Sequence, residues 1–108
     1  MGSPEFCYKE MMKNYILLSV GTSKSLRKRF NDDTLKDKSI DELESIIKQF
    51  NRNHSYYSHF IAGMAANQFL SEWSESNDMI NASFGALGDL MDLVGVYDPG
   101  EPDFQDTE

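Results

Sequence analysis

The stretch SYYSHFIAGMAANQFLSEW, residues 55–73, decides the fold, because it is a long run without proline that carries many bulky apolar side chains. We expect it to form a central helix against which the other helices pack. Its expected core residues are Tyr57, Phe60, Ile61, Met64 and Trp73, flanked by Phe69 and Leu70. A patch of small residues on the same helix would let a second helix approach closely: Ala62, Gly63, Ala65 and Ala66.

The segment before this helix has the clearest local signal in the chain. Residues 39–42 read S-I-D-E, a pattern in which the Ser39 hydroxyl and the Glu42 carboxylate each bond the other residue's backbone amide at a helix start. Apolar residues then recur at helical spacing and predict a helix over residues 40–52. These residues are Leu43, Ile46, Ile47 and Phe50.

Polar residues separate that helix from the central one. Residues 51–55 read N-R-N-H-S, and these residue types prefer caps and turns. The pattern therefore predicts an interruption between two helices. The alternative is one continuous helix over residues 39–73.

Two further helices are predicted at the N-terminal end. Apolar residues at helical spacing predict a helix over residues 7–20, which Gly21 is placed to end. Thr22 can then cap a short helix over residues 23–31. Residues 32–34 read D-D-T and predict a polar break.

A last helix is predicted over residues 78–94, with an apolar stripe that also holds two glycines. Gly85 and Gly88 each weaken a helix by about 1 kcal/mol relative to alanine, which a close helix crossing against the small patch of the central helix would offset. The tail, residues 96–108, contains two prolines and five acids and is expected to be extended. The stripe comprises Ile80, Phe84, Leu87, Leu90, Met91 and Val94.

These elements predict an all-α protein, a compact array of four to five short helices, bundle-like or orthogonal, with an acidic extended C-terminal tail. With 108 residues the chain can bury one core, so residues 7–95 are expected to form a single helical domain. Residues 1–6, MGSPEF, look like a translated cloning scar and are left out of the expected fold. Native sequence would then begin at Cys7, as a fragment of a longer protein.

The net charge of −8 is distributed unevenly along the chain. Residues 1–54 hold ten basic and eight acidic residues, whereas residues 55–108 hold ten acidic residues and no Lys or Arg. Basic residues make up roughly a tenth of ordinary protein composition, so a half-chain without any is unusual. The C-terminal half is therefore expected to present a negative surface.

No motif in the chain predicts catalysis, a cofactor or a metal site. His54 and His59, the two histidines, are five residues apart and fall on different faces of a helix, whereas helical zinc ligands are usually spaced by four. Ser25 and Lys28 match the S-x-x-K pattern, but the partner motifs of acylating enzymes are absent. We therefore expect a protein that is not an enzyme and that uses neither cofactor nor metal.

The single cysteine, Cys7, cannot form an intramolecular disulfide, which favours a reducing intracellular compartment, cytoplasmic or nuclear. No uncharged apolar stretch is long enough to span a membrane, so we expect no membrane association.

These observations favour a non-enzymatic protein–protein interaction or assembly module, such as an adaptor domain. Six methionines in a short chain fit a surface that adapts to a partner. The partner is expected to be a basic protein that is steered to the acidic C-terminal half. The residues expected to bind it are Asp78, Asp89, Asp92, Asp98, Glu101 and Asp103.

Two alternatives use the basic helix over residues 22–31 or the charge contrast between the halves. A nucleic-acid-associated protein, or one that binds an acidic partner, would use the cations of this helix. A self-assembling subunit would form a homo-oligomer by docking the basic half of one copy on the acidic half of the next. The cations are Lys24, Arg27, Lys28 and Arg29.

Overall fold

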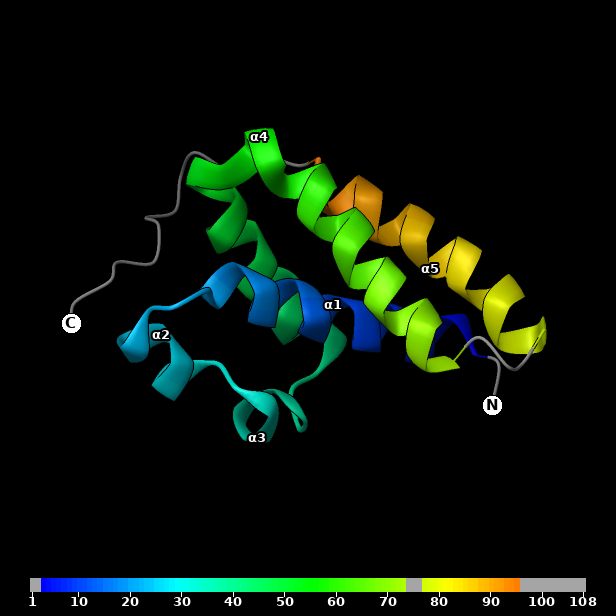
Figure 1. Ribbon diagram of the computed structural model, residues 1–108, viewed down its shortest axis with the longest axis horizontal. Coiled ribbons are helices and arrows are strands. Elements are labelled where there is room, and N and C mark those ends of the chain that lie inside the picture. Colours follow the sequence, from blue (N-terminus) through cyan, green and yellow to red (C-terminus); the bar gives the residue numbers. More distant parts are fainter. Residues whose placement is uncertain (1–2, 74–76, 96–108) are drawn as a thin grey trace.

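The computed structural model describes residues 3–73 and 77–95, without the side chains of residues 52–56. Over these residues the chain is all-α, which confirms the predicted fold class, and Figure 1 shows the helices in their arrangement. The predicted acidic tail, residues 96–108, lies outside the described residues. The helices are α1 (Pro4–Val20), α2 (Lys24–Arg29), α3 (Asp32–Leu35), α4 (Ile40–Trp73) and α5 (Asn77–Val94).

The first helix begins earlier than the sequence predicts. The Ser3 hydroxyl caps α1 by accepting a hydrogen bond from the Phe6 amide at 3.4 Å, and Pro4 occupies the first turn, where its missing N–H costs nothing. The Phe6 ring lies 5.4 Å from the ring of Trp73 and 6.2 Å from that of Phe69, between centroids. Leaving residues 1–6 out of the fold is therefore wrong for the part of that segment that the structure describes.

The short second helix is confirmed, with a different cap. Ser23, rather than Thr22, accepts a hydrogen bond from the Leu26 amide at 3.2 Å. The helix ends at Arg29 because Phe30 adopts extended backbone angles and turns its ring into the core.

The predicted polar break after α2 is wrong, because residues 32–34 lie within the one-turn helix α3. Asn31 and Thr34 form a capping box, in which the Asn31 amide donates to the Thr34 hydroxyl at 2.9 Å and the Thr34 amide donates to the Asn31 side-chain oxygen at 3.1 Å. Leu35 at the end of this turn is fully buried.

Helix α4 starts at the predicted cap. The Ser39 amide donates to the Glu42 carboxylate at 2.9 Å, and the Glu42 amide donates to the Ser39 hydroxyl at 3.1 Å. The predicted interruption at residues 51–55 is wrong, because α4 is one helix of 34 residues, the continuous alternative. No proline removes a backbone donor there, so polar residues alone do not end the helix.

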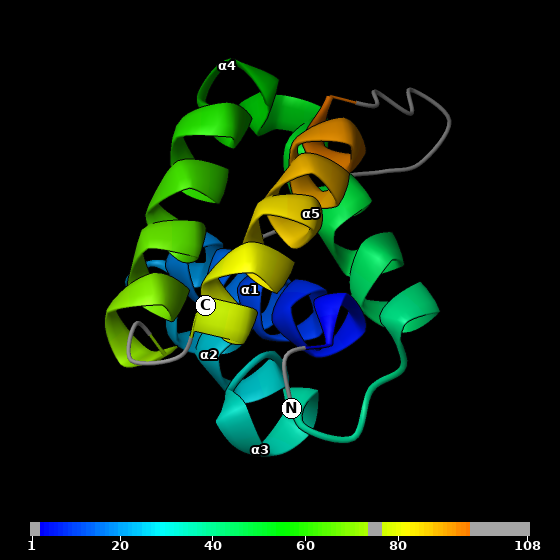
Figure 2. The ribbon, with the colours of Figure 1, turned by 90° about the vertical axis from the view of Figure 1, so that its right-hand side faces the viewer.

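The direction of α4 nevertheless changes in its middle, as both ribbon views show. We call residues 40–51 the first limb and residues 57–73 the second limb. Figure 2 shows α5 between these two limbs, with α1 behind it. Helix α1 contacts both α4 and α5 and contributes a large share of the fully buried side chains. Among them, the Tyr15 hydroxyl donates to the side-chain oxygen of the buried Asn51 in α4.

The second limb packs on a different face from the predicted one. Tyr57 and Phe60, expected in the core, are 59% and 68% exposed, while Met64 and Trp73 are each 40% exposed. The core face instead consists of Ser58, Ala62, Ala65, Ala66 and Phe69. Small side chains on this face let α1 come close enough for the Asn14 side chain to donate to the Ala65 carbonyl at 3.3 Å. The second limb therefore buries the face with small side chains, which lets the helices approach closely, and leaves several of its largest side chains exposed.

Helix α5 lies where the sequence predicts it, but only part of its predicted apolar stripe is buried. Leu90 and Val94 are buried and Phe84 is 65% exposed, while Ile80, Leu87 and Met91 are partly buried. The predicted glycine crossing is wrong, because a Cβ added at Gly63, Gly85 or Gly88 would meet no neighbouring atom within 4 Å. Alanines rather than these glycines are buried on α4 and α5: Ala62, Ala65, Ala66, Ala82 and Ala86.

Candidate functional site

The predicted acidic residues on α5 are exposed but fall into two groups. Asp78 lies in the first turn, whereas Asp89 and Asp92 lie in the last turns, so at 1.5 Å per residue Asp78 is at least about 16 Å from Asp89 along the axis. Asp98, Glu101 and Asp103 lie outside the described residues. The structure therefore does not gather the predicted acidic residues into one site.

Asp89 and Asp92 do line a hollow of about 380 Å³ that the sequence did not predict. It lies between α1, the first limb of α4 and α5, and its third carboxylate is Glu44, which accepts a hydrogen bond from the Tyr8 hydroxyl at 2.8 Å. Burial, with the Glu44 carboxylate beside it, raises the pKa of Tyr8 well above its ordinary value. Lys48 and Leu93 complete the lining. We call this the acidic hollow.

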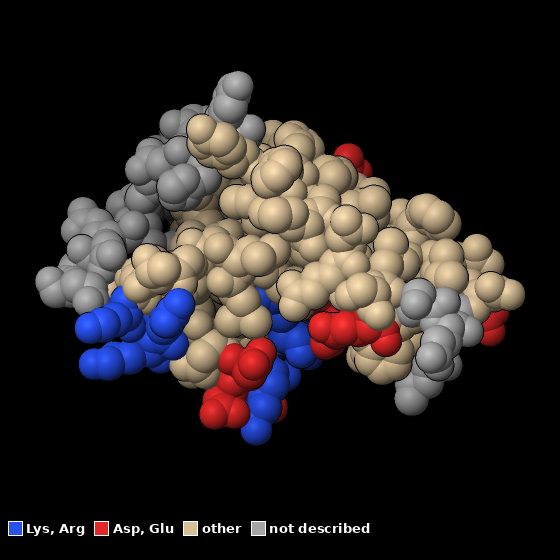
Figure 3. All heavy atoms as spheres, in the orientation of Figure 1, with Lys and Arg blue, Asp and Glu red and all other residues tan. Residues whose placement is uncertain are grey.

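The predicted cations lie together on α2, where all four are exposed: Lys24, Arg27, Lys28 and Arg29. Figure 3 shows Lys and Arg atoms gathered at the end of the molecule where α2 lies. The Arg27 Nε donates to the Gly21 carbonyl at 3.1 Å, which holds this side chain at the C-terminal end of α1. The Arg29 guanidinium lies over the Phe30 ring, 5.2 Å from its centroid.

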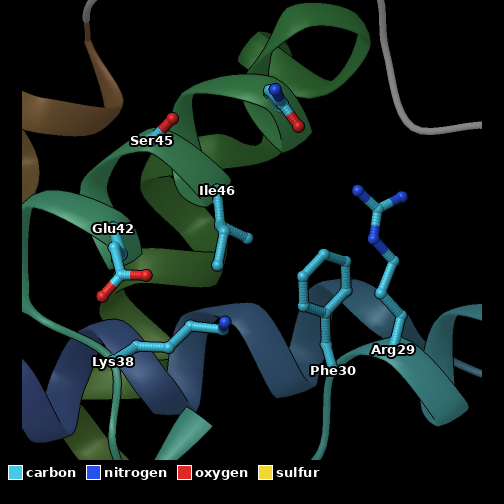
Figure 4. A pocket seen from close by; sticks show the side chains of 7 residues that line it. Arg29, Phe30, Lys38, Glu42, Ser45 and Ile46 are labelled. Carbon is cyan, nitrogen blue, oxygen red and sulfur yellow. The ribbon is translucent and has the colours of Figure 1, made fainter. Parts of the chain in front are cut away.

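Arg29 also borders a hollow of about 340 Å³ between the end of α2 and the first limb of α4 (Figure 4). Arg29 and Lys38 supply positive charge on its two sides, with Phe30 between them. The Glu42 carboxylate lies beside Lys38, and hydrogen bonds from Ser39 lower the pKa of Glu42 below its ordinary value. The Glu42 carboxylate, which also caps α4, offsets one of these two cations, so the lining keeps a single net positive charge.

A third hollow, of about 310 Å³, is lined mainly by apolar side chains. Leu18 and Ser19 from the last turn of α1 face Tyr57, Phe60 and Ile61 from the second limb of α4. The Ser19 hydroxyl donates to the Tyr15 carbonyl within α1 at 2.8 Å, which satisfies its donor. The hollow therefore presents a mostly apolar surface to solvent.

Met64 extends this surface along the second limb, because residues at i, i+3, i+4 and i+7 share one face of a helix. We call Leu18, Tyr57, Phe60, Ile61 and Met64 the apolar stripe. Sequence reasoning assigned its α4 residues to the core. One signal could have indicated otherwise: residues 57–71 contain no Asp, Glu, Lys or Arg, so neither face of this limb could be an ordinary charged surface.

In the described part of the chain, the titratable groups outside the hollows include Cys7 and His59. Across residues 3–73 and 77–95, no group of three His, Cys, Asp or Glu side chains is placed to hold a metal ion. The thiol of Cys7 is buried and donates to the Met79 sulfur at 3.4 Å, and burial raises its pKa. His59 is exposed, and the side chain of His54 lies outside the described residues.

Comparisons with known proteins give no family for this chain. No protein-family model, no curated protein and no solved structure matches it. Within the part of the chain that the structure describes, no helix carries an apolar stretch suited to crossing a lipid bilayer.

Proposed function

We propose that this chain is a non-enzymatic protein-interaction module and that the apolar stripe is its principal binding surface. The observation that carries the proposal is the exposure of Tyr57 and Phe60, 59% and 68%, beside a hollow that they line together with Leu18 and Ile61. Single exposed apolar residues are ordinary, whereas the largest contiguous apolar patch on a monomer is often functional. The buried thiol of Cys7 fits an intracellular location for such a module.

The size of the patch supports this role. An aromatic side chain buries about 150–250 Å² when it is fully covered, so the exposed parts of Tyr57 and Phe60 offer roughly 250 Å². At about 25 cal/mol per Å², covering them contributes about 6 kcal/mol before the cost of association. That cost is about 4–15 kcal/mol, so Leu18, Ile61 and Met64 are needed to complete a stable contact.

Affinity capture with matched variants tests the proposal. We compare the wild-type chain with Tyr57→Ser/Phe60→Ser and with the control Phe84→Ser, since Phe84 on α5 is 65% exposed and lies outside the apolar stripe. The proposal predicts that the stripe variant loses a set of bound proteins that the wild type and the control retain. Equal capture by all three proteins would contradict it, provided that circular dichroism shows the same helical content in each.

A second candidate surface is the acidic hollow, which would bind a basic protein. The observation that favours it is the convergence of Glu44 with Asp89 and Asp92 around one depression, with Lys48 as its one cation. Cations of a partner could pair there, and the association should weaken as salt rises. Asp89→Lys/Asp92→Lys should abolish binding at this surface, with Asp78→Lys as the matched control at the far end of α5. Unchanged capture of basic proteins would exclude this role.

A further inference from the structure

We propose that the apolar stripe binds an acidic amphipathic segment of another protein, one that combines a bulky apolar residue with Asp or Glu side chains. This inference rests on the proposed function and names the chemistry of the partner. It differs from the sequence expectation of a basic partner, because it follows from the charges around the stripe rather than from the charge of the whole chain.

The segments that build the apolar stripe contain no carboxylate. From residue 11 to residue 31 the chain has five Lys or Arg residues and no Asp or Glu. Residues 57–71 contain no Asp, Glu, Lys or Arg. Within these two segments, a partner that covers the hollow therefore meets only cations or neutral groups, although the chain as a whole carries a net charge of −8.

One cation of α2, Arg27, is held close to the α1 side of the hollow. Leu18 lies three residues before Gly21, and the Gly21 carbonyl holds the Arg27 side chain by the 3.1 Å hydrogen bond. Lys24 and Lys28 are exposed on the same short helix. Figure 3 shows the blue cluster against uncharged surface at this end of the molecule.

Along α1, the acidic hollow lies away from the Leu18 end of the apolar stripe. Near Tyr57, by contrast, the last turns of α5, which carry Asp92, pack against α4 through the 3.2 Å hydrogen bond from the Ser58 hydroxyl to the Val94 carbonyl. The α1 residue of the acidic hollow is Tyr8, ten residues before Leu18, which corresponds to about 15 Å along the helix axis. At physiological salt the Debye length is about 8 Å, so the carboxylates around Tyr8 hardly repel a segment bound near Leu18.

These features define how the partner segment binds. Its apolar side chain enters the hollow of about 310 Å³ between Leu18 and Phe60. Its carboxylates face Lys24, Arg27 and Lys28, where charge complementarity sets the orientation and the rate of association. A helical partner would present its anchors at i, i+3, i+4 and i+7, the spacing of the α4 residues in the stripe.

Selection from a random peptide library displayed on phage tests this inference with the whole 108-residue chain. Selected peptides are measured against Tyr57→Ser/Phe60→Ser and against Lys24→Glu/Arg27→Glu/Lys28→Glu. The matched controls are Phe84→Ser and Lys36→Glu, which change exposed residues outside the stripe and outside α2. The helical content of each variant is checked by circular dichroism.

We expect the selected peptides to be enriched in Asp or Glu and in a bulky apolar residue. They should bind each of the two test variants about tenfold more weakly than the wild type, and they should bind the two control variants as well as the wild type. Peptides that need Tyr57 and Phe60 but are basic, or that ignore the α2 changes, would overturn this inference and leave the proposed function intact. If no selected peptide depends on Tyr57 or Phe60, the proposed function fails as well.

Discussion

Replacing Gly63, Gly85 and Gly88 by alanine should stabilise the protein. Each glycine lies inside a helix, and a Cβ added at each position meets no neighbouring atom within 4 Å. Alanine therefore gains its full helix propensity without a steric cost. The sequence expectation of a close crossing at these glycines requires the opposite result, because a methyl group would then separate the helices.

The magnitude follows from the helix propensity scale. Glycine in a helix interior is about 0.8–1 kcal/mol less favourable than alanine, so the triple variant should gain about 2.5 kcal/mol in free energy of unfolding. For a domain of this size that gain corresponds to about 10 °C in melting temperature. Gly21→Ala is the matched control, because Gly21 has φ of 61° and ψ of −128°, a strained conformation for other residues. This change should cost about 1–3 kcal/mol.

Urea unfolding followed by circular dichroism measures both effects on the same scale. Ala66→Leu provides the contrast, because Ala66 is buried on the packed face of α4 and a larger side chain should cost about 1–3 kcal/mol. A loss of stability in any of the three helical glycine variants would refute the packing described for the second limb and α5.

Further predictions concern the core and the α4 cap. Ser39→Ala should cost about 1 kcal/mol in urea unfolding through loss of the capping box, and a wild-type value would mean that the cap is not formed. Hydrogen bonds from Ser39 lower the pKa of Glu42, so the ionised Glu42 carboxylate stabilises the fold at neutral pH, and this stabilisation is lost as pH falls through the lowered pKa. The difference in free energy of unfolding between wild type and Glu42→Gln, measured in urea across pH, should therefore shrink on acidification. A difference that stays constant with pH would exclude this role. Tyr15→Phe should cost about 1–3 kcal/mol, because it leaves the buried Asn51 oxygen without its donor, whereas Tyr15→Phe with Asn51→Leu should recover part of the loss; additive losses in a double-mutant cycle would contradict the pairing. Ile47→Ala should cost about 2–5 kcal/mol in thermal or urea unfolding, since Ile47 is fully buried, and a cost below 1 kcal/mol would place it outside the core.

The sequence predicts correctly those helix ends that depend on interactions between residues close together in the chain. The reciprocal hydrogen bonds of Ser39 and Glu42 depend on residues three apart, so the start of α4 was predictable from four residues. The end of α1 at Gly21 was predictable for the same reason, since a positive φ favours glycine. Residues 51–55 have only weak preferences for caps and turns, and these preferences wrongly predict an interruption where α4 is continuous.

The face that each helix buries was not predictable from periodicity alone. On the second limb, Tyr57, Phe60 and Met64 form one apolar stripe and Ala62 and Phe69 belong to another, and both fit helical spacing. Which stripe is buried depends on how closely α1 and α5 approach, and that distance is a property of the whole fold.

The residues of the binding surfaces were also only partly predictable from the sequence. Asp89 and Asp92 were predicted from sequence as part of an acidic face. Glu44 was not, because it lies in the first limb of α4 and is brought beside them only by the packing of α4 and α5 around α1. The sequence predicts the cations of α2 as a cluster, but the contact of Arg27 with the end of α1 depends on the turn at Gly21.

Photocrosslinking from position 60 tests whether the apolar stripe is a protein-binding surface. A benzoylphenylalanine replaces Phe60 in one copy of the 108-residue chain and Phe84 in another, so that two exposed phenylalanines on different helices are compared. We expect that, in cells that make the protein, position 60 crosslinks to a distinct partner protein and position 84 does not. Crosslinks from position 60 only to residues of the same chain, or identical products from both positions, would contradict the assignment of the apolar stripe as a protein-binding surface.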